Sequence, residues 1–425
     1  MEIDAGLSEF LINVATGDVK EELIRCLSPT GKLVMGMDHA LYGFIESGKL
    51  WYDTITAFLL SLGLTQNPRD PCIYNDEPAM DATGKLMQQL TVCLYVDDIL
   101  VTCTSAGKID AFAAAVQGRF KKTKRVDGQV HSYLGMTLDF TAPGTCSINM
   151  DKFIADVIND THTVKTKRTP STAELFTVDE NSTPLRGGQE KEFHSMVARL
   201  LFASKRARID IQCVVAFLCT RVKAPTEEDW HKLDHLLQYL NGTAKLGLKL
   251  TIGKRGMVHE CFVDASFGVH MDRRSHTGMV DRIGNAVIDT KSAKQKINTS
   301  SSCEAELVAV SESLDRMVQT QDFLNHQGYS MKPMILLQDN ESTMSLISHG
   351  RARSEATRHI DIKYYYVKDY VDRQQMEVQH RATEHMIADF FTKPLGPGRF
   401  IALRDILMGV YAEDDEVRYA EEHKE

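Results

Sequence analysis

Residues 90–104, LTVCLYVDDILVTCT, contain two runs of β-branched and aliphatic side chains that meet at Asp97 and Asp98. This pattern predicts a β-hairpin whose two-residue turn carries both acids, and therefore an antiparallel sheet. Two adjacent carboxylates repel each other, and a divalent cation bound through oxygen is the simplest compensation. An Asp-Asp pair is also good turn chemistry. From these residues alone, a metal site and a plain turn both remain open.

Motifs on both sides of the hairpin favour the metal site. They are, in chain order, ALYG (40–43), WY (51–52), FLLSLG (58–63), DPC (70–72), YVDD (95–98), YLGM (133–136), TP (169–170), RARID (206–210) and LQYLNGT (237–243). In this order they resemble the motifs of copia-type retrotransposon Pol polyproteins over most of the chain. YVDD resembles the YxDD box of the reverse transcriptases in that family.

The resemblance implies a reverse transcriptase palm in which Asp97 and Asp98 bind two Mg²⁺ or Mn²⁺ ions between a dNTP and the primer 3′-hydroxyl. It assigns Tyr95 to the template-primer. The family's third aspartate precedes a (F/Y)LN box, so Asp4, ahead of FLIN at 10–13, is the candidate. The family's fingers come before this point, which implies an N-terminal Pol segment that this sequence lacks. We therefore expect little polymerase activity from the 425 residues.

A second group of acids lies in the C-terminal third of the chain. Asp264 and Asp339 end apolar runs, whereas Glu306 and Asp389 belong to helical patterns. Each alone is compatible with an ordinary acid at the end of a strand or helix. Together they resemble the family's ribonuclease H (RNase H) boxes, in VDAS (263–266), SSCEAEL (301–307), QDNES (338–342) and ADFFTKP (388–394). The resemblance implies that these four acids hold two Mg²⁺ or Mn²⁺ ions, with Glu304 as the alternative to Glu306.

Basic and polar segments near these acids predict contacts with nucleic acid. The segments 274–278, 291–295 and 358–364 resemble the family's RKSTSG, WKSKKQ and KHIDIRYH motifs. Side chains of this kind commonly contact the phosphate backbone. A solvated charged face, or helix capping by His359, is the competing interpretation. The predicted contacts are Arg274, Lys291, Lys294, Gln295, Arg358, His359 and Lys363.

The periodicity predicts both α+β and α/β architecture. With the resemblance described above, it implies a partial palm of antiparallel sheet with helices, a helical connection, and an RNase H-like mixed α/β domain. The predicted segments are a partial reverse transcriptase with palm and start of thumb at 1–168, a polar linker at 169–188, a helical thumb or connection at 189–255, the RNase H-like domain at 256–396, and an acidic tail at 397–425.

Composition alone does not point to nucleic acid. The net charge of −9 gives no overall attraction to phosphates, although Lys and Arg are grouped locally. The nine cysteines contain no CxxC pair, which argues against a zinc site or a disulfide framework. No secretory signal and no apolar run of about 20 residues is present. We expect an intracellular protein, nuclear or in cytoplasmic virus-like particles, without a membrane partner.

The leading hypothesis is a magnesium-dependent RNase H joined to a palm that holds the duplex. Its expected partners are an RNA–DNA hybrid, template-primer nucleic acid and, where the polymerase is active, dNTP. The second hypothesis is a catalytically silent remnant of an element that at most binds nucleic acid. A DDE integrase core is disfavoured, because the YVDD hairpin and connecting helices precede the C-terminal domain.

Overall fold

The computed structural model describes residues 2–36, 44–81, 86–349 and 358–411. The chain divides into two compact units. Unit 1 comprises residues 1–66, 71–77 and 89–102, and unit 2 comprises residues 67–70, 78–88 and 103–425. ALYG at 40–43 lies outside the described residues.

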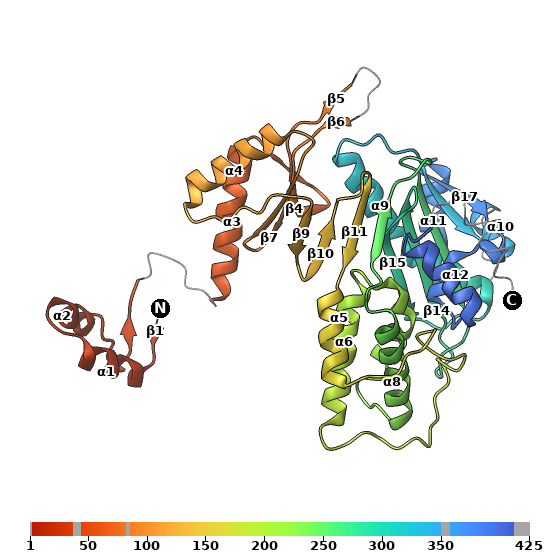
Figure 1. Ribbon diagram of the computed structural model, residues 1–425, viewed down its shortest axis with the longest axis horizontal. Helices are drawn as coiled ribbons and strands as arrows, with labels where there is room; N and C mark the ends of the chain where they lie inside the picture. The colour runs from red at the N-terminus through yellow and green to blue at the C-terminus, as the bar shows by residue number, and fades with distance from the viewer. Residues whose placement is uncertain (1, 37–43, 82–85, 350–357, 412–425) are drawn as a thin grey trace. The chain divides into compact units, whose positions relative to one another are not determined.

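Unit 1 contains most of a four-stranded sheet in the order β3-β4-β7-β8, next to helix α3 (Figure 1). Thr56 on α3 and Tyr74 on β4 share a hydrogen bond of 2.7 Å between their hydroxyls, and Ile55 and Leu59 of the helix are fully buried. The elements are β1 Glu2–Ile3, α1 Ala5–Val14, α2 Asp18–Arg25, β2 Leu33–Val34, α3 Ile45–Ser61, β3 Thr65–Asn67, β4 Asp70–Asn75, β7 Thr91–Tyr95 and β8 Asp98–Thr102.

The predicted hairpin at 90–104 is confirmed, but its turn lies one residue earlier than expected. Tyr95 pairs with Asp98, so the two turn residues are Val96 and Asp97, and Asp98 begins β8. Val96 has φ of 53°, a conformation that β-branched residues rarely adopt. The indole N–H of Trp51 donates to the Val96 carbonyl at 2.6 Å. The turn is therefore fixed by a contact that its own sequence does not reveal.

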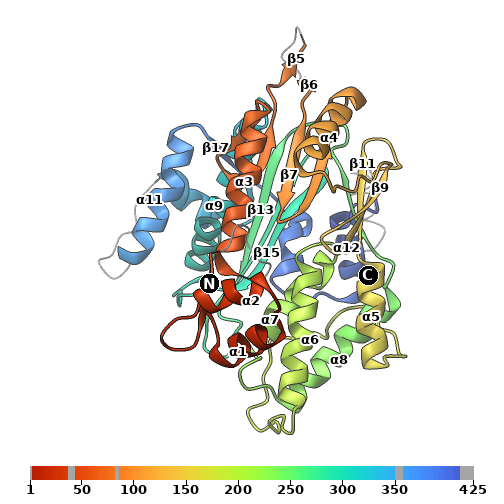
Figure 2. The same ribbon diagram turned by 90° about the vertical axis from the view of Figure 1, so that its left-hand side faces the viewer.

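Among the described residues, unit 2 contains a five-stranded sheet, a four-stranded sheet in the order β12-β11-β10-β9, the two-stranded sheet β5-β6 and most of the helices. Figures 1 and 2 show α5, α6 and α8 gathered in one helical group. The elements are β5 Ala79–Met80, β6 Leu86–Gln88, α4 Ala106–Phe120, β9 Val130–Tyr133, β10 Met136–Asp139, β11 Thr145–Asn149, α5 Asp151–Thr161, α6 Gln189–Ser204, η1 Ile209–Ile211, α7 Gln212–Cys219, α8 Glu227–Gly242, β12 Leu248–Thr251, β13 His259–Ser266, β14 His276–Ile283, β15 Ala286–Lys294, α9 Ser302–His326, β16 Met334–Gln338, α10 Glu341–His349, α11 Arg358–Asp372, β17 Met376–His380, η3 Thr383–His385, η4 Ile387–Phe391 and α12 Pro397–Leu407.

The larger sheet has the order β15-β14-β13-β16-β17. β13, β14 and β15 form an antiparallel meander, whereas β16 and β17 run parallel to β13. The 25-residue helix α9 connects the meander to β16, which is the kind of crossover that parallel pairing requires. This is the mixed α/β domain that the sequence predicts.

The two faces of this sheet belong to different cores, because side chains alternate along a strand. Val263 points into a core with α9 and α11, together with Leu307 and Leu314 of α9. Phe262 points into a second core that the sheet shares with α6, α7 and α8. Helices of the predicted connection thus share a core with one face of the sheet, together with η4 and α12.

An ion pair lies fully buried within the helical group. The Arg208 guanidinium donates to both Asp210 carboxylate oxygens at 2.9 and 2.8 Å, and neither side chain is exposed. The Tyr239 hydroxyl donates to the same carboxylate at 2.7 Å. Thr243 accepts two further hydrogen bonds from Arg208. The RARID motif therefore has a structural role.

The sequence-based boundary that starts the acidic tail at residue 397 is placed too early in the chain. Residues Pro397–Leu407 form α12, and Phe400, Leu403 and Ile406 lie in the core shared with α6–α8. The acids that suggested a tail are concentrated after residue 411, outside the described residues. None of the described helices combines the length and the hydropathy that crossing a bilayer requires.

Candidate active site

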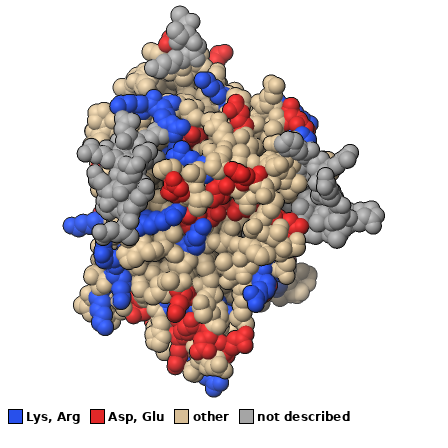
Figure 3. All heavy atoms as spheres, turned by 90° about the vertical axis from the view of Figure 1, so that its right-hand side faces the viewer, with Lys and Arg blue, Asp and Glu red and all other residues tan. Residues whose placement is uncertain are grey.

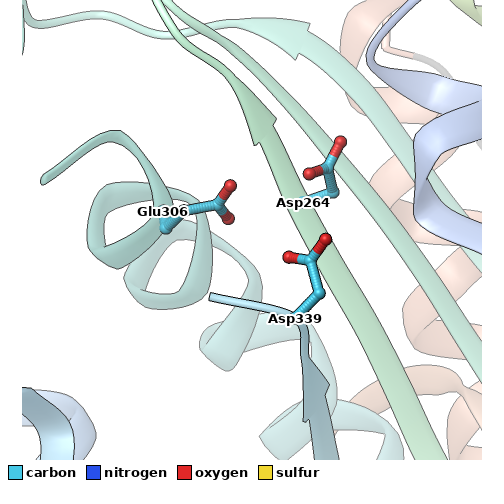
Figure 4. A group of neighbouring side chains, drawn as sticks. All are labelled: Asp264, Glu306 and Asp339. Carbon is cyan, nitrogen blue, oxygen red and sulfur yellow. The ribbon is translucent and has the colours of Figure 1, made fainter. Parts of the chain in front are cut away.

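Three of the four predicted C-terminal acids converge. Asp264, Glu306 and Asp339 each offer a carboxylate oxygen, and these oxygens lie within 4.8 Å of one another. Figure 4 shows the three carboxylates pointing toward one another from β13, α9 and the end of β16. Among the residues that the structure describes, no other group of three or more His, Cys, Asp or Glu side chains meets this distance.

The local sequence explains how the acids are held. Asp264 is near the end of β13, and Asp339 follows the last residue of the neighbouring parallel strand β16. Glu306 is in the second turn of α9, where its carboxylate accepts from the Ala265 N–H at 3.1 Å and from the Gln338 amide at 3.2 Å. Crossover topology brings both strand ends and the helix to one edge of the sheet.

Glu304 has a different role from Glu306. Its carboxylate accepts from the Ser300 N–H and hydroxyl at 2.7 Å each, next to the Ser301 cap of α9. The geometry therefore places Glu306 in the acidic group and Glu304 at the start of the helix.

The site carries excess negative potential. Burial, followed by the charge of Asp264, raises the pKa of Glu306 to about 9. Burial also raises the pKa of Asp264. Both shifts mean that the positive charge near the two carboxyl groups, which for Asp264 comes from Lys393, does not fully compensate their desolvation and mutual repulsion. Three closely spaced carboxylates fit a hard divalent cation, which prefers oxygen ligands.

Asp389 lies beside this group without belonging to it. It is in the short helix η4 and is 2% exposed. Its carboxylate pairs with Lys393 at 2.7 Å and with Arg399 at 2.5 Å. Thr392, from the same loop, donates a short hydrogen bond to Asp264. The predicted fourth acid therefore contacts two cations, and its loop supports the first acid.

Gly278 allows η4 to pack closely against β14. A Cβ atom at this position would lie 2.8 Å from the Ala388 carbonyl oxygen, 2.5 Å from the Thr392 methyl and 3.1 Å from the Phe391 Cβ. The glycine in the segment 274–278 thus serves the approach of the loop that carries Asp389.

We expect Gly278→Ala to lower the stability of unit 2 by about 1–3 kcal/mol, since overpacking must displace η4. Gly118→Ala is the matched control, because a Cβ there meets nothing within 4 Å in helix α4. Urea unfolding in a Trp51→Phe background, which leaves Trp230 as the remaining tryptophan of the two, measures both. Equal stability of the two variants would contradict the packing argument.

The palm candidates are exposed in unit 1. Asp97 and Asp98 lie at the hairpin tip, and Tyr95 is 55% exposed. Asp4 is the N-cap of α1, where it accepts from the Gly6 N–H at 2.9 Å. Within the described part of the chain, these three aspartates do not form a metal-binding group.

The predicted nucleic-acid contacts divide into three sets. Arg274 and Lys294 pair with Asp272, and Lys291 pairs with Glu312. Gln295 is 1% exposed and donates to Thr277 and to the Ala305 carbonyl, so the expected contact of Gln295 with nucleic acid disagrees with its burial. The side chains of Arg358, His359 and Lys363 lie outside the described residues.

A buried histidine pair behind the site was not predicted. Ser292 donates to the Phe391 carbonyl at 2.7 Å, so it accepts from His276 Nε2 at 2.8 Å. His276 Nδ1 then accepts from His270 Nε2 at 2.9 Å. Phe176, from the predicted linker, lies 5.1 Å from both imidazole rings. This chain of hydrogen bonds supports η4 from behind.

Lowering the pH is expected to reduce the stability of unit 2, because the imidazole rings of His270 and His276 become protonated in the unfolded chain. Burial lowers the pKa of His276 to about 3 and that of His270 to about 4, below the 6.5 of an ordinary imidazole. The unfolded chain therefore binds more protons, and the stability from neutral rings is lost as pH falls below 6.5. At pH 5 this loss is about 2 kcal/mol for each ring. Urea unfolding at pH 7 and at pH 5 measures this loss. The free energy of unfolding should fall by about 2 kcal/mol less in His276→Gln than in the wild type, and an equal fall in both would contradict the role given to His276.

Comparison with known proteins identifies relatives over most of the chain. The family described as "Reverse transcriptase (RNA-dependent DNA polymerase)" matches residues 18–173. The "Retrovirus-related Pol polyprotein from transposon TNT 1-94" of Nicotiana tabacum is 26% identical over 92% of this chain, and that from transposon RE1 of Arabidopsis thaliana is 27% identical over 85%. The "Truncated transposon Ty1-A Gag-Pol polyprotein" of Saccharomyces cerevisiae is 24% identical over 89%. The chain spans only 24–32% of the length of these relatives.

Two solved structures also resemble part of the chain. RNase H1 from the halophilic archaeon Halobacterium salinarum is 12% identical and covers 32% of this chain and 93% of its own, with a TM-score of 0.25. LC11-RNase H1, isolated from compost, is 15% identical with the same coverage and a TM-score of 0.26.

Proposed function

Since the chain is related to copia-type retrotransposon Pol proteins and carries a reverse transcriptase region, we propose that its C-terminal domain is an RNase H that cleaves the RNA strand of an RNA–DNA hybrid. The observation that carries the proposal is the convergence of Asp264, Glu306 and Asp339 at one edge of the mixed sheet. The pKa of Glu306, raised to about 9, supports a site built to accept positive charge.

Asp264, Glu306 and Asp339 would hold the divalent metal, Mg²⁺ or Mn²⁺. Two such ions would supply an activated water and a counter-charge for the leaving oxygen. The protein's own part is positional. Thr392 fixes Asp264, while the Ala265 N–H and Gln338 orient the two oxygens of Glu306. The burial of Asp264 and Glu306 limits screening of their charges by bulk water.

The surface charge is compatible with a polyanionic substrate. On the face shown in Figure 3, acidic side chains gather near the centre, and Lys and Arg side chains lie beside them. A metal ion bound at Asp264, Glu306 and Asp339 would coordinate one phosphate of the nucleic acid, while Lys and Arg side chains would contact other phosphates of its backbone. The proposed partners are an RNA–DNA hybrid and template-primer nucleic acid.

Cleavage of a labelled hybrid tests this proposal. The purified chain with Mg²⁺ or Mn²⁺ should cut end-labelled RNA annealed to DNA, and should spare the same RNA as a single strand. Chelation by EDTA should stop the reaction. If the chain is folded but fails to cut the hybrid with Mg²⁺ and also with Mn²⁺, the result would favour the second hypothesis, a catalytically silent remnant of an element.

We further propose that residues 1–425 alone do not extend a primer. Asp97 and Asp98 remain exposed at the hairpin tip, but Asp4 is engaged as a helix cap. A primer-extension assay with template-primer, dNTPs and Mg²⁺ should give no product. Robust extension would contradict this and would make Asp4 the candidate third ligand.

An intracellular site of action, in cytoplasmic particles or the nucleus, is also proposed. None of the nine cysteines, which all lie within the described ranges, forms a disulfide, and this suits a reducing compartment.

A further inference from the structure

Lys393 occupies a position between two acids of the candidate site. Its ammonium lies 2.7 Å from an Asp389 oxygen and 3.8 Å from an Asp264 oxygen. Asp264 and Asp389 are 4% and 2% exposed, so both carboxylates are desolvated. Because two such groups repel each other, the ammonium stabilises their approach as a cation would.

Arg399 completes the neutralisation of Asp389. It pairs with the second carboxylate oxygen at 2.5 Å, and it also donates to the Thr383 carbonyl at 3.1 Å. Asp389 therefore has a cation on each oxygen, whereas Asp264, Glu306 and Asp339 form the metal-binding group without it. The four acids divide into a group of three and a separately compensated fourth.

The two cationic side chains can leave without unfolding the core. The side chain of Lys393 is 41% exposed and that of Arg399 is 42% exposed. A flexible lysine on the rim can exchange a carboxylate for a phosphate oxygen of an incoming strand, because both are anionic acceptors.

We propose that the Lys393 ammonium occupies the position of a cation between Asp264 and Asp389, and that it leaves this position when it binds a phosphate of the substrate instead. Without substrate, the protein would therefore bind one divalent ion, on Asp264, Glu306 and Asp339. A second ion would bind between Asp264 and Asp389 only after Lys393 has moved. This inference rests on the proposed RNase H function and assigns Lys393 as a positioning residue, with Arg399 holding Asp389 in place.

Counting bound Mn²⁺ tests the inference without relying on cleavage. Electron paramagnetic resonance reports free Mn²⁺ during titration of the full chain in the absence of nucleic acid. Lys393→Gln should bind one more ion than wild type, or bind it at least tenfold more tightly. Lys393→Arg keeps a cation and should behave as wild type. Lys368→Gln, which removes a lysine paired with Asp372, is the control for net charge and should also match wild type.

The gain must depend on Asp389. Adding Asp389→Asn to Lys393→Gln should abolish the extra ion, which separates this site from any other acids in the chain. Equal Mn²⁺ binding by wild type and Lys393→Gln would overturn the inference while leaving the three-acid site intact. Mn²⁺ binding that Asp339→Asn does not change would instead overturn the metal group of the proposed function, and the inference with it.

Discussion

Asp339→Asn is expected to abolish hybrid cleavage while the domain stays folded. The change keeps the size of the side chain and its hydrogen bond from Thr383, 3.0 Å from the carboxylate, but removes the charge that holds metal. Loss of several kcal/mol of stabilisation in the transition state corresponds to a fall in rate of about 100-fold or more. The hybrid-cleavage assay measures this directly. Asp372→Asn, an exposed change of equal charge outside the acidic group, should cleave as wild type.

Thermal melts separate this loss of ligand from a loss of fold. Without metal, Asp339→Asn should melt at or slightly above the wild-type temperature, because the substitution removes one of the negative charges that disfavour the ionised form of Glu306. Adding Mg²⁺ should raise the melting temperature of the wild type more than that of the variant. Equal shifts together with retained cleavage would mean that Asp339 is not a ligand.

Asp210→Asn is expected to lower the stability of unit 2 by about 3–5 kcal/mol. Arg208 is fully buried, and the substitution leaves its guanidinium charge without a counter-ion. The remaining hydrogen bonds to Thr243 do not neutralise that charge. Urea unfolding followed by Trp230 fluorescence in the Trp51→Phe background provides the measurement.

A second Arg–Asp pair in the same region provides the control. Arg199 and Asp160 lie 2.7 Å apart, but their side chains are 30% and 61% exposed. Water screens this pair, so Asp160→Asn should cost less than about 1 kcal/mol. A cost for Asp210→Asn as small as that for Asp160→Asn would show that burial does not make the first pair more important for stability than the exposed pair.

The strands and helices that carry the acids were predictable because their signals are local. The runs HECFVDAS and HTGMVDRI have the bounds of β13 and β14, and the helical pattern after Ser301 is α9. That Asp264 and Asp339 share a site was implied by the resemblance of their motifs to the RNase H boxes of the family, and the parallel pairing of β13 and β16 explains why the two acids meet at one edge of the sheet.

The details that the sequence did not reveal come from distant contacts. Asp389 is neutralised by Arg399, which lies in a stretch that was expected to be a tail. Phe176 looks like a linker residue, yet it packs on His270 and His276. Gln295 looked like a polar surface residue, and its amide satisfies the Ala305 carbonyl inside the domain. No helical or strand periodicity encodes such pairs, because their partners lie between 10 and about 100 residues apart in the chain.

The core shared by the mixed sheet and α6–α8 determines which fragments can be produced on their own. Recombinant expression of residues 256–396 would remove the helical group and α12, which share a core with Phe262, Val280 and Leu337, and would expose the part of that core that η4 does not cover. An apolar surface of this kind promotes aggregation. A soluble fragment has to begin before Met150, the first residue of that core, and has to extend past Met408, its last.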